Sequence, residues 1–331
     1  MYFNLEYIEK SFYFCRIKEL IINHTKQHNN MSITKLDQML EVLKSKQKKR
    51  LVAAFANDSH TIGAINGAVN HGIVDATLVG DKDVIAQICK DENIDISKFK
   101  IVHEADEMKA TTLAVKLIND GEGNMLMKGT VTTDKYMRAI LNKETGLMNP
   151  GAILTHIAVL ENSAYHKLLV CSDVAIIPAP DFKQKLTMCN YLISTAKALG
   201  IAKPKVAVIA ATEQVSYSMP ACVDGAILAK MSDRGQIKDG IIDGPLALDV
   251  AIDKESAEIK KLKSEVAGDA DCLLFPSIEA GNVFYKTHTK LCGGELGAFV
   301  AGARVPAILS SRGDSELTKL YSIALAALTA K

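Results

Sequence analysis

A serine and an arginine stand side by side where an apolar segment gives way to a helical one, within the run 309–315. Backbone N–H groups at the start of a helix have no partner inside the helix and attract anions. The Ser311 hydroxyl adds a hydrogen-bond donor, and the planar guanidinium of Arg312 suits phosphate oxygens. The segment predicts an anion site, because a cation at a helix N-terminus is unfavourable unless an anion lies beside it.

The same residues also fit a plain helix cap. Ser311 is followed three residues later by Asp314, which resembles a capping box with Asp in place of Glu or Gln. The two interpretations are compatible, since a capped helix start still presents other N–H groups to an anion.

A second segment with the same character lies at 127–141. An apolar strand ends at Lys128 and Gly129, small hydroxyl residues follow, and a helix then begins at a cap that is either Thr132 or Thr133. Arg138 lies one to two turns into that helix, where a solvated surface arginine is the simpler interpretation. Two such strand ends in one chain favour a shared phosphate cleft.

Two further segments carry polar groups without a unique interpretation. Asp243 and Asp249 are consistent with three interpretations: a helix cap and a surface acid, a general base, or metal ligands. Asn282 and Lys286 lie on a predicted helix, where they either cap and line that helix or reach a cleft.

Several chemistries are disfavoured because their motifs are missing. The chain has no G-x-G-x-x-G, no G-x-x-x-x-G-K-[ST], no G-x-S-x-G and no H-E-x-x-H, and its eight histidines are dispersed. Kinases, Rossmann dehydrogenases, hydrolases and zinc enzymes are therefore poor matches.

The charge balance and the cysteines narrow the class further. Lysine and arginine number 39 and aspartate and glutamate 38, so the formal net charge is +1. This argues against bulk electrostatic binding to nucleic acid or to a membrane surface. No apolar run approaches the ~18 residues of a membrane helix. The seven cysteines include no C-x-x-C pair, which favours reduced thiols in a cytoplasm.

Strand-like and helix-like segments alternate along the chain, which predicts an α/β fold in two lobes. A break at 147–151 marks a plausible domain junction. The runs 157–160 and 168–171 suit a hairpin. The predicted strands are 51–56, 76–79, 101–102, 125–127, 157–160, 168–171, 174–177, 206–211, 272–275 and 305–309, and the predicted helices include 106–118, 182–199, 219–231 and 315–327.

The first thirty residues differ from the rest. They hold six of the 18 tyrosine and phenylalanine residues and lack the pattern of a signal peptide. Two interpretations are open: a docking helix, or an upstream addition to a protein that usually starts at Met31. We favour the second, because the globular pattern is complete without this segment.

Taken together, these segments resemble the phosphate acyltransferase family, the phosphate acetyl- and butyryltransferases, and within it most closely the phosphate butyryltransferases. The likeness spans about residues 31–331. The runs that carry it are MKGTVTTDKYMRAILNKETGL (127–147), GAILTHIAVLE (151–161), MSDRGQ (231–236), DGPLALD (243–249), EAGNVFYK (279–286) and SRGDSELTKLYS (311–322).

This resemblance implies two α/β domains with a cleft between them, as in the isocitrate/isopropylmalate dehydrogenase architecture. It implies a discontinuous first domain of residues 31–150 plus 297–331, a second domain of residues 151–296, and an atypical extension at 1–30. The C-terminal strand and helix would then bring Ser311 and Arg312 close to Thr133 and Arg138 in one cleft.

The resemblance also implies roles for single residues. Ser311 and Arg312 match the phosphate-binding pair of the family, and Arg138 matches an arginine important for activity. In the acetyl branch an aspartate proposed as the base falls at the position of Thr318. The nearest carboxylates here are Asp314 and Glu316, so the identity of a base stays open.

The implied reaction is butyryl-CoA plus phosphate to butyryl phosphate plus CoA, by direct attack and without an acyl-enzyme. We expect acyl-CoA and phosphate as substrates, no bound cofactor, no metal, a cytoplasmic homo-oligomer, and no nucleic acid or membrane partner. Phosphate acetyltransferase is the nearest alternative. A metal- and NAD-dependent decarboxylating dehydrogenase on the related fold is an alternative of a different class.

Overall fold

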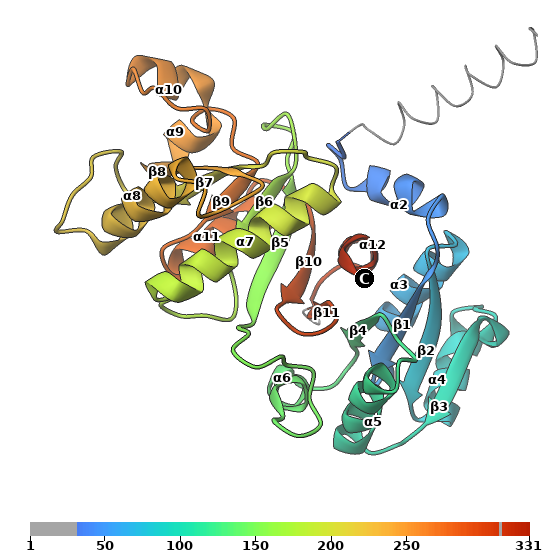
Figure 1. The fold of residues 1–331 in the computed structure, drawn as a ribbon. Coiled ribbons are helices and arrows are strands. Elements are labelled where there is room, and N and C mark those ends of the chain that lie inside the picture. Colours follow the sequence, from blue (N-terminus) through green and yellow to red (C-terminus); the bar gives the residue numbers. More distant parts are fainter. Residues whose placement is uncertain (1–31, 311–312) are drawn as a thin grey trace, which may run out of the picture.

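A single mixed sheet runs through the whole molecule in the computed structural model, which describes residues 32–310 and 313–331 (Figure 1). Its eleven strands lie in the order β3-β2-β1-β4-β11-β10-β5-β6-β9-β7-β8. The strands are β1 (Lys49–Ala54), β2 (Val74–Gly80), β3 (Phe99–His103), β4 (Met125–Lys128), β5 (Thr155–Glu161), β6 (Leu169–Ser172), β7 (Lys205–Ile209), β8 (Ile241–Leu246), β9 (Cys272–Leu274), β10 (Glu295–Ala301) and β11 (Ala307–Ile308).

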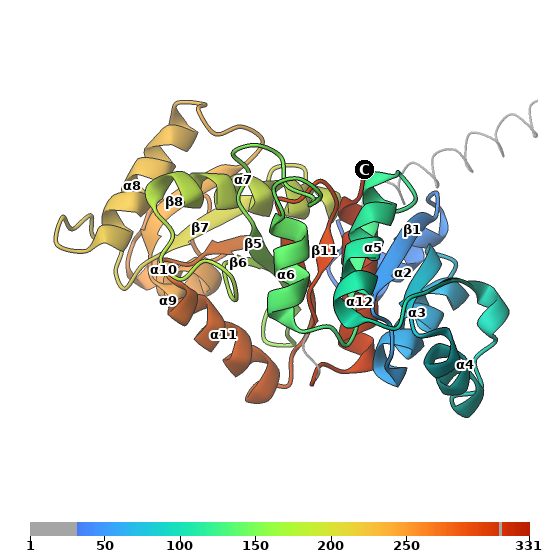
Figure 2. The ribbon, with the colours of Figure 1, turned by 90° about the horizontal axis from the view of Figure 1, so that it is seen from below.

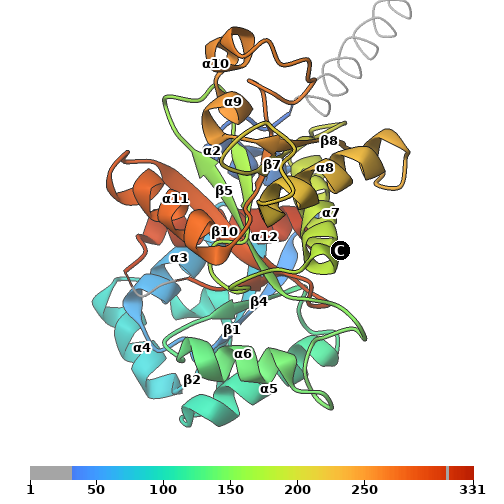
Figure 3. The ribbon, with the colours of Figure 1, turned by 90° about the vertical axis from the view of Figure 1, so that its left-hand side faces the viewer.

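Helices cover both faces of this sheet, as Figures 2 and 3 show, which confirms the predicted α/β class. The helices are α2 (Asp37–Lys44), α3 (Ser59–Asn70), α4 (Lys82–Asp91), α5 (Glu107–Asn119), α6 (Thr133–Leu141), α7 (Phe182–Ala198), α8 (Pro220–Asp233), α9 (Leu248–Ile252), α10 (Lys254–Ile259), α11 (Ile278–Lys290) and α12 (Glu316–Thr329), with a 3-10 turn η1 (Ile96–Lys98).

The apolar core is continuous on one face of the sheet and divided into two clusters on the other. One continuous apolar cluster joins α2, α3, α4, α12, α7 and α8 to the sheet. On the other face, α5 and α6 pack with one cluster, and α9, α10 and α11 pack with a separate one. The first face therefore ties the two halves of the chain together, while the second leaves them as separate packing units.

Strand direction changes near the centre of the sheet, and the lasting change comes at the antiparallel pair β5–β6. Strand β10 runs antiparallel to both of its neighbours, β11 and β5, and β5 in turn runs antiparallel to β6. The strands β6, β9, β7 and β8 therefore run opposite to β1, β4 and β11. Carboxyl ends of parallel strands in the two halves consequently lie at opposite edges of the sheet.

The C-terminal segment joins the first half of the chain. Strand β11 pairs in parallel with β4, and α12 packs against α3 and β10. This arrangement agrees with a first domain that the chain leaves and re-enters. The exact domain boundaries at 150/151 and 296/297 stay a prediction, because one sheet spans both halves.

Most predicted elements of the sequence are present, and one is wrong. The hairpin β5–β6 pairs as expected, and the long helix α7 ends at Gly200, whose φ is +88°. The expected strand 174–177 is absent. Its N–H groups at Ala175, Ile176 and Ile177 donate to the buried Asp173 carboxylate and are not available for a ladder. The sequence also missed β8 and the central strand β10.

A charged cluster joins the strand starts of the second half. Lys167 lies 2.7 Å from carboxylate oxygens of both Asp269 and Asp271, and Lys205 lies 2.6 Å from Asp269. Burial raises the pKa of Asp269, but hydrogen bonds and charges of the two lysines outweigh it and lower the pKa to about 2. The ionised carboxylate therefore stabilises the fold.

We predict that Asp269→Asn destabilises the protein at neutral pH and less so in acid. A lowered pKa means that the stabilisation is complete above about pH 4 and is lost as the pH falls toward 2. Since the Asp269 side chain is 41% exposed, we discount for solvent screening and expect about 1 kcal/mol. Urea unfolding at pH 7 and pH 3 measures this, with Asp233→Asn on the exposed face of α8 as the control. An equal loss at both pH values contradicts the prediction.

Candidate functional site

Three neighbouring parallel strands end at one edge of the sheet, and each leads toward a helix. Strands β1, β4 and β11 lie side by side, and α3, α6 and α12 begin after them. Ligands of open α/β sheets bind beyond the carboxyl ends of the strands, where unpartnered N–H groups of helix starts gather.

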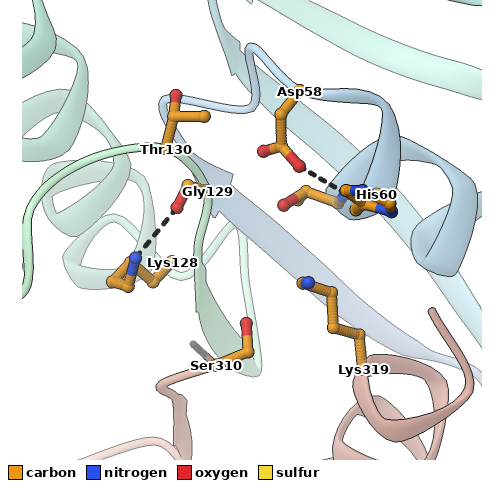
Figure 4. A pocket seen from close by; sticks show the side chains of 8 residues that line it. Asp58, His60, Lys128, Gly129, Thr130, Ser310 and Lys319 are labelled. Carbon is orange, nitrogen blue, oxygen red and sulfur yellow. Dashed lines mark hydrogen bonds between the residues drawn. The ribbon is translucent and has the colours of Figure 1, made fainter. Parts of the chain in front are cut away.

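A pocket of about 200 Å³ lies at this edge (Figure 4). A water molecule occupies about 30 Å³ in the liquid, so the pocket has room for a tetrahedral anion and part of a second reactant. Its lining comes from all three strand ends and from α3 and α12: Asp58, His60, Thr61, Lys128, Gly129, Thr130, Ser310 and Lys319.

The floor of the pocket depends on a close contact between the ends of β1 and β4. The Phe55 carbonyl accepts the N–H of Thr130 at 3.0 Å and its hydroxyl at 3.1 Å. A Cβ at Gly129 would lie 2.2 Å from the same oxygen, so this position requires glycine. Phe55 itself has φ +55°, an uncommon conformation that turns its carbonyl toward the β4 end.

Lys128 supplies a buried cation at the end of β4. Its side chain is 4% exposed, and Nζ donates to the carbonyls of Gly129 at 3.1 Å and Val131 at 3.0 Å. These carbonyls belong to the turn that leads into α6, so the amine is fixed beside the pocket (Figure 4).

Lys319 supplies a second buried cation, from the first turns of α12. It is 3% exposed, and Nζ donates to the carbonyl of Asp314 at 2.9 Å. Within residues 32–310 and 313–331 it forms no ion pair. The buried Lys185 differs, because it lies 2.6 Å from the Asp224 carboxylate. A buried ammonium without a counter-ion is costly, so the pocket favours an anion.

Asp58 caps α3 at the opposite wall. Its Oδ1 accepts the N–H of Thr61 at 2.8 Å, as expected for an N-cap aspartate. Figure 4 shows its carboxylate and the Lys319 amine pointing toward the same space. The two groups form no ion pair among the contacts of the described chain.

The predicted phosphate pair, Ser311 and Arg312, lies outside the described residues. Ser310, which directly precedes it, lines the pocket and is 6% exposed. The expected cap at Ser311 is not the start of the helix. Helix α12 is capped instead by Ser315, whose hydroxyl accepts the N–H of Thr318 at 3.0 Å.

The two candidate bases of the same segment do not line the pocket described above. Asp314 contributes its carbonyl to Lys319. Glu316 lies in the first turn of α12 against α3, where a Cβ at Gly63 would come within 2.7 Å of its carboxylate. Their roles as bases stay predictions.

The predicted site residues that follow β4 lie at the start of α6 or on its exposed face. Of the two predicted caps, Thr132 is the N-cap of α6, but its side chain makes no capping bond and its N–H donates to the Glu107 carboxylate at 2.9 Å. Thr133 opens the helix and is exposed. Arg138 is 72% exposed and pairs with Asp134 at 2.9 Å, so it does not line the pocket. Its expected position close to Ser311 and Arg312 involves residues outside the described ranges, so that position and its role stay predictions.

Asp243 and Asp249 are not among the residues that line this pocket, and their expected place in a phosphate or CoA cleft stays a prediction. Asp243 lies in β8, six strands away from β11 in the sheet, which corresponds to roughly 29 Å. Its carboxylate accepts the N–H of Gly244, and Asp249 lies 3.3 Å from Lys260. The antiparallel pairing of β5 with β6 places the end of β8 at the opposite edge of the sheet.

Asn282 and Lys286 lie on α11, away from the described pocket lining. The Asn282 amide donates to the carbonyl of Val174 at 2.9 Å and so ties α11 to the segment after β6. Lys286 is exposed. Burial, and then the Asp314 carboxylate, raise the pKa of the neighbouring Tyr285, which indicates that this part of α11 faces the 313–315 segment.

Sequence reasoning therefore found Lys128 and Gly129 but missed Asp58 and Lys319 as site residues. Lys319 carried one usable signal: it stands on the apolar face of its helix, four residues before Ile323, where a lysine must be buried.

Two absences among the described residues bear on other functions. No group of three or more histidine, cysteine, aspartate or glutamate side chains there is arranged to hold a metal ion. Across the same part of the chain, no helix has both the length and the apolar character needed to span a bilayer.

Comparisons with known proteins agree with the geometry. Residues 103–327 match the family model described as "Phosphate acetyl/butaryl transferase". The chain is 44% identical over 298 residues to the phosphate butyryltransferase of Clostridium acetobutylicum, covering 90% of this chain and 99% of that protein. It is 38% identical over 295 residues to the phosphate acetyltransferase of Thermotoga maritima, covering 89% and 99%.

A solved structure shows the same architecture. The branched-chain phosphotransacylase from Enterococcus faecalis superposes with a TM-score of 0.74 at 27% identity, covering 85% of this chain and 98% of that one. A phosphotransacetylase from Streptococcus pyogenes gives a TM-score of 0.77 at 20% identity, covering 90% and 98%, and supports the fold alone. The resemblance seen in the sequence is confirmed, and the chain belongs to the phosphate acetyl/butyryl transferase family.

Proposed function

We propose that this chain reversibly transfers a butyryl group between coenzyme A and inorganic phosphate. Butyryl-CoA and phosphate give butyryl phosphate and CoA in one direction. The relatives with 44% and 46% identity, both phosphate butyryltransferases, support this choice of acyl group.

One observation carries the phosphate part of the proposal. Lys319 is buried without a carboxylate partner among the described residues, in a pocket that Lys128 also lines. Phosphate carries the negative charge that this pocket lacks. It also has several oxygens that accept hydrogen bonds from lysine side chains.

The pocket suits direct attack of phosphate on the thioester carbonyl, without an acyl-enzyme. The charges of the buried Lys128 and Lys319 are fixed before the reactants arrive, so they stabilise charge that develops on oxygen without reorganising. Holding phosphate beside the acyl carbon also removes much of the entropy cost of a two-substrate reaction. The leaving thiol has a reference pKa of about 8.5, so expelling it needs only modest acid assistance.

We further propose that Ser311 orients the phosphate and that Arg312 offsets its charge, on the strength of the family pattern and of the position of Ser310 in the pocket. Arg138 is proposed to support phosphate or CoA binding. Its exposed ion pair with Asp134 offers no support for this, so Arg138→Ala with unchanged KM for both substrates and unchanged kcat removes it from the account.

The proposal also covers three general properties of the active protein. We propose that no resident metal or cofactor is needed, that the protein is a homo-oligomer, and that it works in the cytoplasm. The six cysteines of the described residues are unpaired and five of them are buried, which suits a reducing compartment.

Phosphate acetyltransferase activity is the alternative, supported by the relative from Thermotoga maritima at 38% identity. Two further CH₂ groups in an apolar pocket favour butyryl over acetyl by about 1.6 kcal/mol, or about fifteen-fold in kcat/KM. A rate series over acetyl-, propionyl-, butyryl- and isobutyryl-CoA decides between them.

The reaction itself is tested by CoA release from butyryl-CoA, followed with a thiol reagent in the presence and absence of phosphate. We expect release that depends on phosphate, persists with EDTA and needs no NAD. Release at the same rate without phosphate indicates a thioesterase, and dependence on NAD with a divalent metal indicates the dehydrogenase alternative.

We predict that Lys319→Met raises the KM for phosphate and leaves the KM for butyryl-CoA within about threefold. A hydrogen bond to a charged group contributes about 1.5–3 kcal/mol, so kcat/KM for phosphate falls about 10- to 150-fold. Methionine fills a similar volume without a buried charge, so the thermal midpoint stays or rises.

Lys230→Met is the control, because Lys230 is an exposed lysine on α8 that pairs with Asp233. Its kinetics should match the parent protein. If Lys319→Met keeps the parent KM for phosphate, the buried amine is not the phosphate ligand.

A further inference from the structure

Asp58 contributes a carboxylate to the lining of a pocket that otherwise suits anions. Its Oδ1 accepts the Thr61 N–H at 2.8 Å, which completes the cap of α3. Its Oδ2 is buried and has no hydrogen-bond partner among residues 32–310 and 313–331. A buried acceptor without a partner costs about 1–3 kcal/mol, so it calls for an explanation.

Helix capping alone does not explain why Oδ2 of Asp58 is buried without a hydrogen-bond partner among the described residues. Asp81 caps α4 and Asp106 caps α5 in the same way, and neither has a buried oxygen without a partner. Asp58 is distinguished by its place in the pocket, opposite Lys319 (Figure 4). An ionised carboxylate only accepts hydrogen bonds, so the missing partner is a donor.

The reaction supplies such a donor. Inorganic phosphate near neutral pH carries at least one O–H, whereas the acyl phosphate dianion carries none. As the phosphate oxygen forms its bond to the acyl carbon, the C–S bond breaks and the thiolate of CoA leaves. One proton therefore leaves the phosphate and ends on the sulfur, and no oxidant or further reactant is required.

We propose that Asp58 accepts the hydrogen bond from the phosphate O–H and takes up its proton as phosphate attacks, after which the thiolate takes that proton. This rests on the proposed function. It also makes Asp58 a specificity residue, because sulfate at neutral pH has no proton to donate and meets only the repulsion of the carboxylate.

The fold supports this role over that of the two carboxylates expected from sequence. Asp314 uses its carbonyl to hold Lys319, and neither Asp314 nor Glu316 belongs to the lining of this pocket. Asp58 is held in place by its own cap bond to the start of α3, so one oxygen fixes the side chain while the other has no hydrogen-bond partner among the described residues.

Asp58→Asn tests the proposal, because asparagine also caps helices well and the fold should persist. We expect kcat to fall about 10²- to 10⁴-fold, the usual contribution of a general base. We expect sulfate to inhibit the variant at least ten-fold more strongly than the parent, since the repulsion is gone. Asp58→Ser, another good cap, should show the same loss of rate.

Asp81→Asn is the matched control, a capping aspartate at the end of the adjacent strand β2, and its kinetics should be unchanged. If the parent protein shows no phosphate-dependent CoA release, the proposed function fails. If the parent is active but both Asp58 variants keep its kcat within threefold and its weak response to sulfate, the role of Asp58 is overturned while the function stands.

Discussion

The buried charge of Lys319 is the constraint on which the site depends. Its amine is held by the Asp314 carbonyl and has no carboxylate partner among the described residues, in contrast to the buried Lys185, which pairs with Asp224. Transferring an ammonium out of water costs several kcal/mol unless an opposite charge compensates. The protein tolerates this cost beside a pocket, which is the arrangement expected where an anionic substrate completes the site.

The rest of the fold explains how that charge reaches the pocket. Strand β11 pairs with β4, and this pairing brings α12 back to the first half of the chain beside α3. The close contact of Gly129 with the Phe55 carbonyl then brings the ends of β1 and β4 together. Lys128, Asp58 and Lys319, which are far apart in sequence, meet because three parallel strands end at one edge.

Local patterns predicted much of this, and long-range pairing explains what they missed. The strand end at Lys128–Gly129 and a helix cap at Thr132 or Thr133 follow from neighbouring residues, so both features were predicted, and the structure places the cap at Thr132. The place of β10 between β11 and β5 depends on a pairing between residues more than a hundred positions apart, so local patterns missed this central strand. Asp173 is a second case that local patterns did not predict. Its carboxylate accepts hydrogen bonds from N–H groups of an apolar run whose sequence is typical of a strand.

The most direct test of the account is a crystal structure of the protein with inorganic phosphate bound in the absence of CoA. We expect the phosphate in the pocket at the ends of β1, β4 and β11, with one oxygen within hydrogen-bond distance of Lys319 Nζ and another close to Asp58 Oδ2. Phosphate bound elsewhere, with this pocket holding only water and Lys319 turned away from it, contradicts the account.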